Sequence, residues 1–160
     1  MHTNALQVFK NPNIDKDYLI EIEIPEFTCV CPVTGQPDFA TIYIQYIPDL
    51  SCLELKSIKL YVWSFRDKPD FHEAITNNII KDIENACAPR FARVRAKFNV
   101  RGGTYPTITC VIKKDQWELP PDLNLLGIRT NKDFYQAGLP SEILEAELRR
   151  LPAPKSFKQS

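Results

Sequence analysis

The hydrophobic pattern of this chain predicts an α+β fold with a mostly antiparallel sheet, built from two strands, two helices and two further strands. Apolar and polar residues alternate over 18–24 and 94–100, which is the period of a strand with one solvated face. Between them, apolar residues recur at steps of three and four over 55–65 and 71–83, the period of a helix packed on one side. Strands and helices grouped in this order favour an α+β arrangement over a parallel sheet.

Prolines and glycines set the expected limits of the four strands. Pro25 ends or bends the first strand. The second strand, over 39–47, is rich in β-branched and aromatic residues and stops at Pro48. A Gly-Gly pair at 102–103 separates the third strand from a fourth around 108–112. We expect the first two strands to form an antiparallel pair joined by the loop between them.

Polar residues mark the expected starts of both helices. Ser51 and Glu54 have the spacing of a capping box, so the first helix is predicted to begin there. Asp70 and Glu73 give the second helix a similar start, and that helix is predicted to end near Pro89.

The two ends of the chain are less regular than its centre. Residues 1–16 are polar and predict an arm or loop. Residues 114–160 predict a C-terminal extension that includes a short helix at 131–136. The length suits one domain over residues 1–160, with its core at about 17–113.

Composition excludes several classes of function. Lysine plus arginine and aspartate plus glutamate number 20 each, and the pI is near 6.7, which argues against direct binding of nucleic acid. Glutamates interrupt the most apolar segment, so no membrane span is predicted, and the N-terminus lacks the layout of a secretory signal. Five cysteines form no regular framework, which favours a reduced protein of the cytoplasm. A four-stranded sheet has two open edges, and their pairing between copies predicts a homo-oligomer.

The segment from Cys31 to Asp38 is the strongest candidate for a reactive site. It places a thiol, a turn punctuated by proline and glycine, and a carboxylate close together in the chain. A turn can expose a thiolate and return a proton donor to it, so Cys31 is the candidate nucleophile and Asp38 the candidate general acid. The alternatives are a cysteine that packs as a small apolar residue and an aspartate that closes a turn.

Residues at the starts of the two helices are candidate ligand contacts. Glu54 and Glu73 are either helix caps or acceptors for the N–H groups of a guanine-like ligand. His72 is either an inert helix-start residue or a contact beside Glu73. Lys56 and Lys59 share a helix face, which is either solvated or suited to a phosphate.

A zinc site is a further alternative. Cys29 would lie on the same strand face as Cys31, and with His72 these residues could supply three ligands to a catalytic zinc. Cys-x-Cys is not a usual zinc spacing and no fourth ligand is evident, so we expect no metal. The other three cysteines, Cys52, Cys87 and Cys110, occupy positions typical of the core.

With these residues laid out, the sequence resembles the 7-cyano-7-deazaguanine reductases, the nitrile reductases of queuosine biosynthesis. Residues 26–43 look like the nucleophile loop of that family. Residues 54–61 read Glu-Leu-Lys-Ser-Ile-Lys-Leu-Tyr and fit, without a gap, the family signature Glu-(Ser or Leu)-Lys-(Ser or Ala)-hydrophobic-Lys-(Leu or Tyr)-aromatic. The resemblance covers residues 17–113, and the tail beyond does not match the usual ending of the family. Further matching segments are Phe65-Arg66, Asp70–Glu73, Pro89-Arg90 and Arg101–Gly103.

The resemblance implies a tunnelling fold, in which β-β-α-α-β-β subunits close a barrel by oligomerising, typically as two stacked pentameric rings in the compact form. It implies NADPH-dependent reduction of the nitrile of 7-cyano-7-deazaguanine to an aminomethyl group, a step of tRNA queuosine biosynthesis. The reaction would pass through a covalent cysteine thioimide and consume two NADPH per turnover. No Gly-x-Gly-x-x-Gly motif is present, so cofactor binding of the Rossmann kind is not expected.

The resemblance also implies roles for individual residues. Cys31 matches the nucleophile, and Asp38 matches the proton donor. Positions that match contacts to the deazaguanine are Leu53, Glu54, Leu55, His72 and Glu73. Positions in the segment associated with NADPH are Lys56, Ser57 and Lys59.

Related enzymes leave alternatives for the reaction. An amidine-forming relative keeps the thioimide but adds ammonia or another nitrogen donor, and it is expected to have a broken NADPH signature, whereas here the signature is whole. A zinc-dependent GTP cyclohydrolase-like enzyme shares the fold, and bound metal would distinguish it. A non-catalytic ligand-binding subunit would be indicated by an unreactive Cys31.

Overall fold

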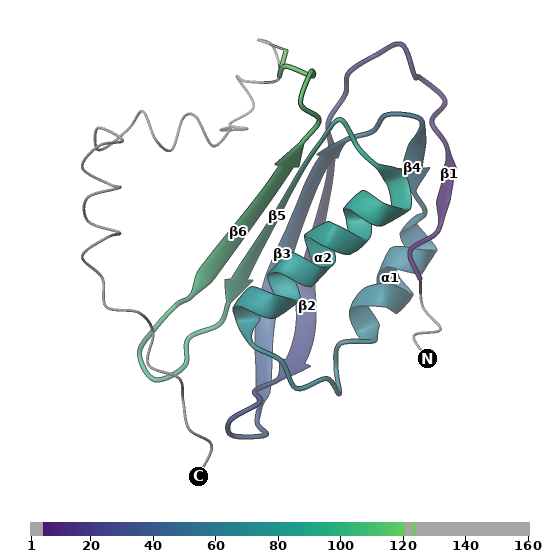
Figure 1. Cartoon of the computed structure of the whole chain (residues 1–160). Helices are drawn as coiled ribbons and strands as arrows, with labels where there is room; N and C mark the ends of the chain where they lie inside the picture. The colour runs from purple at the N-terminus through teal and green to yellow at the C-terminus, as the bar shows by residue number, and fades with distance from the viewer. Residues whose placement is uncertain (1–4, 121–122, 124–160) are drawn as a thin grey trace, which may run out of the picture.

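An antiparallel sheet of four strands, in the order β2-β3-β5-β6, forms the centre of the molecule (Figure 1). The computed structural model describes residues 5–120 and 123, so the helix predicted at 131–136 lies outside the described residues. The antiparallel pairing of the first two long strands is confirmed. The strands of this sheet are β2 (Ile20–Val30), β3 (Pro37–Ile47), β5 (Phe91–Phe98) and β6 (Thr107–Lys113).

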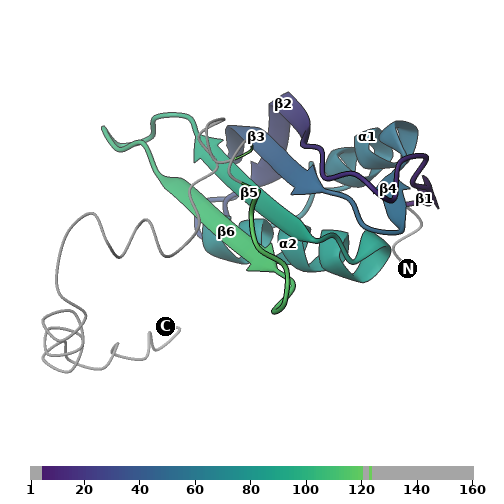
Figure 2. The ribbon, with the colours of Figure 1, turned by 90° about the horizontal axis from the view of Figure 1, so that it is seen from above.

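Two helices, α1 (Leu55–Trp63) and α2 (His72–Cys87), lie on the same face of this sheet (Figures 1 and 2). The longer helix, α2, packs against β5 and β6. Ile75, Ile79 and Ile83 recur at steps of four, so they form one apolar stripe, and all three are buried. The α+β arrangement predicted from the sequence is therefore confirmed.

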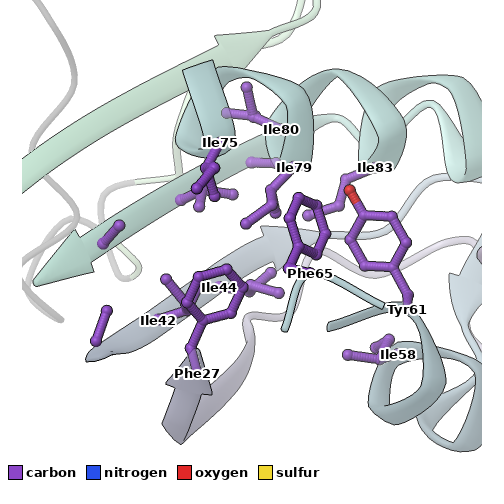
Figure 3. Close-up of a cluster of buried hydrophobic side chains, with 14 of the residues drawn as sticks. Phe27, Ile42, Ile44, Ile58, Tyr61, Phe65, Ile75, Ile79, Ile80 and Ile83 are labelled. Carbon is purple, nitrogen blue, oxygen red and sulfur yellow. The ribbon is translucent and has the colours of Figure 1, made fainter. Parts of the chain in front are cut away.

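The core fills the space between the sheet and the helices (Figure 3). The ring of Phe65, after α1, lies 5.5 Å from the ring of Phe27 and 5.3 Å from that of Tyr61, measured between centroids. Burial of each large apolar side chain stabilises the fold by about 1.5–3 kcal/mol. The ring contacts of Phe65 therefore tie the end of α1 to the second half of β2. The core residues labelled in Figure 3 are Phe27, Ile42, Ile44, Ile58, Tyr61, Phe65, Ile75, Ile79, Ile80 and Ile83.

Pro25 bends β2 and does not end it. The pairing of β2 with β3 shifts register between Ile24 and Phe27 and then resumes as far as Val30 opposite Pro37. The strand consequently includes Cys29, whose side chain is fully buried on the helix-covered side.

The predicted arm at 1–16 and the predicted helix start at Ser51 are each wrong in part. β1 (Val8–Lys10) pairs antiparallel with β4 (Ser51–Leu53), forming a small second sheet. The first helix therefore begins later, with Glu54 as its N-cap. The Glu54 carboxylate accepts hydrogen bonds from the backbone N–H groups of Lys56, at 2.8 Å, and Ser57, at 2.6 Å.

The second helix begins at the predicted place, but without the predicted capping box. Its N-cap is Phe71, which makes no side-chain capping hydrogen bond, because the Asp70 carboxylate accepts from the N–H of Phe71 itself at 2.9 Å. The helix ends before Pro89, as predicted, with Ala88 in the left-handed conformation at φ 39°.

Two strand edges remain open in the single chain. Within the described residues, β6 pairs only with β5, and β2 pairs only with β3 apart from a single bridge between Val30 and Pro69. The sheet face away from the helices is partly polar, and there Arg93 donates a hydrogen bond of 2.7 Å to Gln45, which in turn donates to Glu21. The same face also carries a second, smaller apolar cluster around the buried Ile47 and Phe91. None of the helices in the described part of the chain is long and apolar enough to cross a membrane.

Candidate active site

The loop between β2 and β3 presents the Cys31 thiol at one end of the sheet. The backbone N–H of Cys31 donates to the carbonyl of Gln36 at 2.8 Å, and the N–H of Gly35 donates to the carbonyl of Cys31 at 2.9 Å. Gly35 has φ +68°, a left-handed conformation that a glycine adopts at little cost. These contacts close a compact turn, so Cys31 is partly exposed, whereas Cys29 is buried in the preceding strand.

The connection between the helices runs beside the end of β2 and brings α2 to the thiol loop. The N–H of Val30 donates to the carbonyl of Lys68, and the N–H of Asp70 donates to the carbonyl of Val30, both at 3.1 Å. These bonds form a short parallel bridge between Val30 and Pro69. The first residues of α2 are consequently placed next to Cys31.

Asp38 lies at the centre of the site and is only 8% exposed. One carboxylate oxygen accepts a hydrogen bond of 2.6 Å from Nη1 of Arg101, and the other lies 3.2 Å from Nε2 of His72. The ring of His72 stacks on Phe98, with centroids 3.6 Å apart and planes inclined by 11°. This stacking fixes the imidazole so that Nε2 faces Asp38, which makes the pair suitable for holding or transferring a proton.

The two neighbouring thiols differ strongly in acidity. The hydroxyl of Thr34 and the N–H groups of Thr34 and Val33 donate to the sulfur of Cys31, and with the charge of Arg101 they lower the pKa of Cys31 to about 7. Burial and nearby acidic groups raise the pKa of Cys29 to about 12. At neutral pH, therefore, only Cys31 is an effective nucleophile of the two.

Cys31, Asp38, His72 and Glu73 all line one pocket of about 450 Å³, together with Asn99 and Arg101. Glu73 is exposed and Phe71, at the rim, is 58% exposed, so a carboxylate and an aromatic face are both available to a ligand. The predicted nucleophile, proton donor and two of the predicted substrate contacts are thus brought together by the fold.

The predicted contacts of the first helix do not line this pocket within one chain. Glu54 caps α1, Leu53 is buried and Leu55 is 57% exposed. Ser57 is buried, accepting from the N–H of Gln7 at 2.9 Å and donating to the carbonyl of Glu54 at 2.7 Å. Its hydroxyl therefore ties α1 to the segment before β1.

Lys56 and Lys59 are both exposed near the start of α1. Two ammonium groups on one exposed helix face suit an anionic ligand, such as the phosphate groups of a dinucleotide.

A larger cavity, of about 790 Å³, lies between α1 and α2. It is lined by Tyr61, which donates a hydrogen bond of 2.6 Å to Asp82, and by Phe65 and Lys68. No thiol lines this cavity, so cavity size alone does not identify the reactive site.

Among the residues that the structure describes, no group of three or more histidine, cysteine or acidic side chains is arranged to hold a metal ion.

Sequence reasoning assigned no role to Arg101, Thr34 or Phe98, although all three shape the site. The Gly-Gly turn after a clearly alternating strand was the available signal for Arg101, because such a turn directs the residue before it back across the sheet end. Thr34 carried no signal beyond its place beside Gly35, and Phe98 was predicted only as one of the apolar residues of the alternating strand 94–100.

Comparison with known proteins assigns the chain to a family. A family model described as QueF-like protein matches residues 37–117. A protein of Nitrosococcus oceani is 53% identical over 120 residues, spanning 75% of this chain and 93% of the relative. A protein of Methylobacillus flagellatus is 52% identical over 132 residues, spanning 82% of this chain and 95% of the relative. Both relatives are named NADPH-dependent 7-cyano-7-deazaguanine reductase.

A solved structure supports the same class of fold. The crystal structure of the archaeosine synthase QueF-Like in the apo form matches with a TM-score of 0.55 at 22% identity, covering 58% of this chain and 91% of that chain. The chain thus has the α+β subunit of the tunnelling fold, with a thiol-containing pocket at one sheet end. It belongs to the QueF-like protein family.

Proposed function

We propose that this protein is an NADPH-dependent 7-cyano-7-deazaguanine reductase, which converts the nitrile of its substrate to an aminomethyl group in queuosine biosynthesis. The observation that supports this most directly is the pocket in which an acidified Cys31 thiol faces Asp38, His72 and Glu73. The relatives that carry this enzyme name are more than 50% identical to the chain. Five free cysteines are consistent with action in the reducing cytoplasm.

Cys31 begins the proposed reaction as a thiolate. Its sulfur attacks the nitrile carbon, one C≡N π bond breaks, and a proton passes to the nitrogen, which yields a covalent thioimide. Asp38 is the proposed proton donor, and its contact with Nε2 of His72 supplies a route by which the proton is replaced. Loss of the thiolate after the first reduction and a second reduction complete the conversion.

The substrate is proposed to sit over the start of α2. The Glu73 carboxylate, which is exposed in the pocket, accepts hydrogen bonds from the N–H groups of the deazaguanine ring. The aromatic face of Phe71 is available beside it for stacking.

The cofactor is proposed to be held by the exposed ammonium groups of Lys56 and Lys59 through its phosphates. When bound, NADPH supplies hydride to the former nitrile carbon, twice per turnover. Ser57 contributes to this site through the position of α1, because its own hydroxyl is buried and bonded.

A homo-oligomer is proposed because the site is divided in the single chain. The residues of α1 and the Cys31 pocket do not meet within one protomer, and β2 and β6 each have an open edge in the described residues. Pairing of these edges between copies would close a barrel, in the proposed form two stacked pentameric rings. Light scattering of the purified protein measures the number of copies.

Covalent capture tests the proposed role of Cys31. Incubation with 7-cyano-7-deazaguanine without NADPH should add the mass of the substrate to the protein, as measured by intact mass spectrometry. Cys29→Ala should still be captured, because Cys29 is buried and its pKa is about 12. Cys31→Ala should not be captured, and an adduct on Cys31→Ala would refute the assignment.

A further inference from the structure

Arg101 occupies a backbone position that is fixed independently of the thiol loop. It precedes a tight turn between β5 and β6. In this turn the N–H of Arg101 donates to the carbonyl of Thr104 at 3.1 Å, and the carbonyl of Arg101 accepts from the N–H of Thr104 at 3.2 Å. The two central residues, Gly102 and Gly103, have φ values of 58° and 78°, as the favoured two-residue hairpin turns require. This turn and the thiol loop lie at the same end of the sheet (Figure 1).

The guanidinium of Arg101 joins three side chains of the thiol loop. Nη1 donates to Asp38 at 2.6 Å, and Nη2 donates to the hydroxyl of Thr34 at 2.6 Å and to the side-chain carbonyl of Gln36 at 2.9 Å. The planar guanidinium reaches the three acceptors from two nitrogens in a fixed geometry, whereas a lysine would have to reach them from a single nitrogen. The candidate nucleophile and the candidate proton donor therefore depend on one clamp.

The hydrogen bonds of Thr34 give this clamp a chemical consequence. Its hydroxyl oxygen accepts from Arg101 and also from the backbone N–H of Gln36, at 3.3 Å. A hydroxyl has two acceptor lone pairs and one proton, so both acceptor positions are taken and the O–H remains as a donor. The turn closed by the backbone bonds of Cys31 with Gln36 and Gly35 holds Thr34 beside the thiol. The Thr34 hydroxyl lowers the pKa of Cys31 more than any other single group does, and the charge of Arg101 adds a smaller direct effect.

We propose that Arg101 is a positioning residue for the reaction, acting through Thr34: by donating to the Thr34 hydroxyl it directs the O–H of that hydroxyl to the sulfur of Cys31, while it holds Asp38 on the other side of the pocket. This inference rests on the proposed function of Cys31 as the nucleophile. It assigns a role to a residue outside both the nucleophile loop at 26–43 and the signature segment at 54–61.

Alkylation of Cys31 by iodoacetamide across pH 6 to 10 tests this proposal, with the modified peptide identified by mass spectrometry. The wild-type profile should have its midpoint at about 7. Arg101→Gln should raise the midpoint by up to about one and a half units, toward the ordinary thiol value. Arg101→Lys should give an intermediate midpoint, because it keeps the charge and loses the fork. Arg95→Gln, an exposed arginine of β5, is the matched control and should leave the midpoint unchanged.

A double-mutant comparison separates action through Thr34 from a general effect of charge or folding. Thr34→Val should raise the midpoint and Thr34→Ser should keep it near the wild-type value, because serine retains the hydroxyl. Adding Arg101→Gln to Thr34→Val should shift the midpoint by less than half of what Arg101→Gln does alone. An unchanged midpoint in Arg101→Gln, or an equal shift in both backgrounds, overturns the proposal. Alkylation requires neither nitrile nor NADPH, so failure of the reductase activity would leave this result interpretable.

Discussion

The acidity of Cys31 makes the rate of nitrile capture depend on pH in a defined way. With a pKa of about 7, about one tenth of the thiol is ionised at pH 6 and about nine tenths at pH 8. Because the thiolate is the attacking species, the rate of thioimide formation should rise about tenfold over this interval and then level off.

The assay is single-turnover capture of 7-cyano-7-deazaguanine without NADPH, quenched with acid and quantified by intact mass. Cys29→Ala is the matched control and should give the same profile, since that buried thiol contributes no thiolate below pH 10. A rate that keeps rising beyond pH 8.5, as for an unperturbed thiol, would refute the proposed action of the thiol loop on Cys31.

Three further predictions concern binding and stability. Glu73→Ala, made in a Cys31→Ala background to prevent covalent capture, should weaken substrate binding by roughly 10- to 100-fold in calorimetry, because a charge-assisted contact is lost; Glu84→Ala on the same helix is the control, and equal affinities would leave Glu73 without a role in binding. Ile79→Ala should lower the free energy of unfolding in urea by about 2–5 kcal/mol, because the side chain is fully buried; a loss below about 1 kcal/mol would contradict the packing in Figure 3. Ala88→Gly should raise that free energy by up to about 1 kcal/mol by relieving the left-handed conformation, and a decrease would show that Ala88 is not strained.

The parts of the fold that were predictable from sequence are those whose pattern is set by one buried face. Apolar residues alternate along β5 and recur at steps of four along α2 because one side of each element packs against the core. Both elements were therefore identified correctly from the sequence. The start of α1 was misplaced because residues 51–53 pair with β1, a partner about forty residues earlier that no local signal reveals.

The site was predictable only where chemistry and local sequence coincide. Cys31 and Asp38 flank one turn, so their proximity follows from the loop itself. The approach of His72 and Glu73 depends on the bridge between Val30 and Pro69, and that of Arg101 depends on a hairpin at the far end of β5. Neither is encoded by spacing along the chain.

Oxidation of NADPH by the purified protein, with and without 7-cyano-7-deazaguanine and with product analysis, tests the central claim most directly. The proposed function predicts oxidation only when the nitrile is present, with two NADPH consumed for each aminomethyl product formed. A covalent adduct on Cys31 without any oxidation of NADPH would contradict the reductase and indicate an amidine-forming reaction at the same thiol.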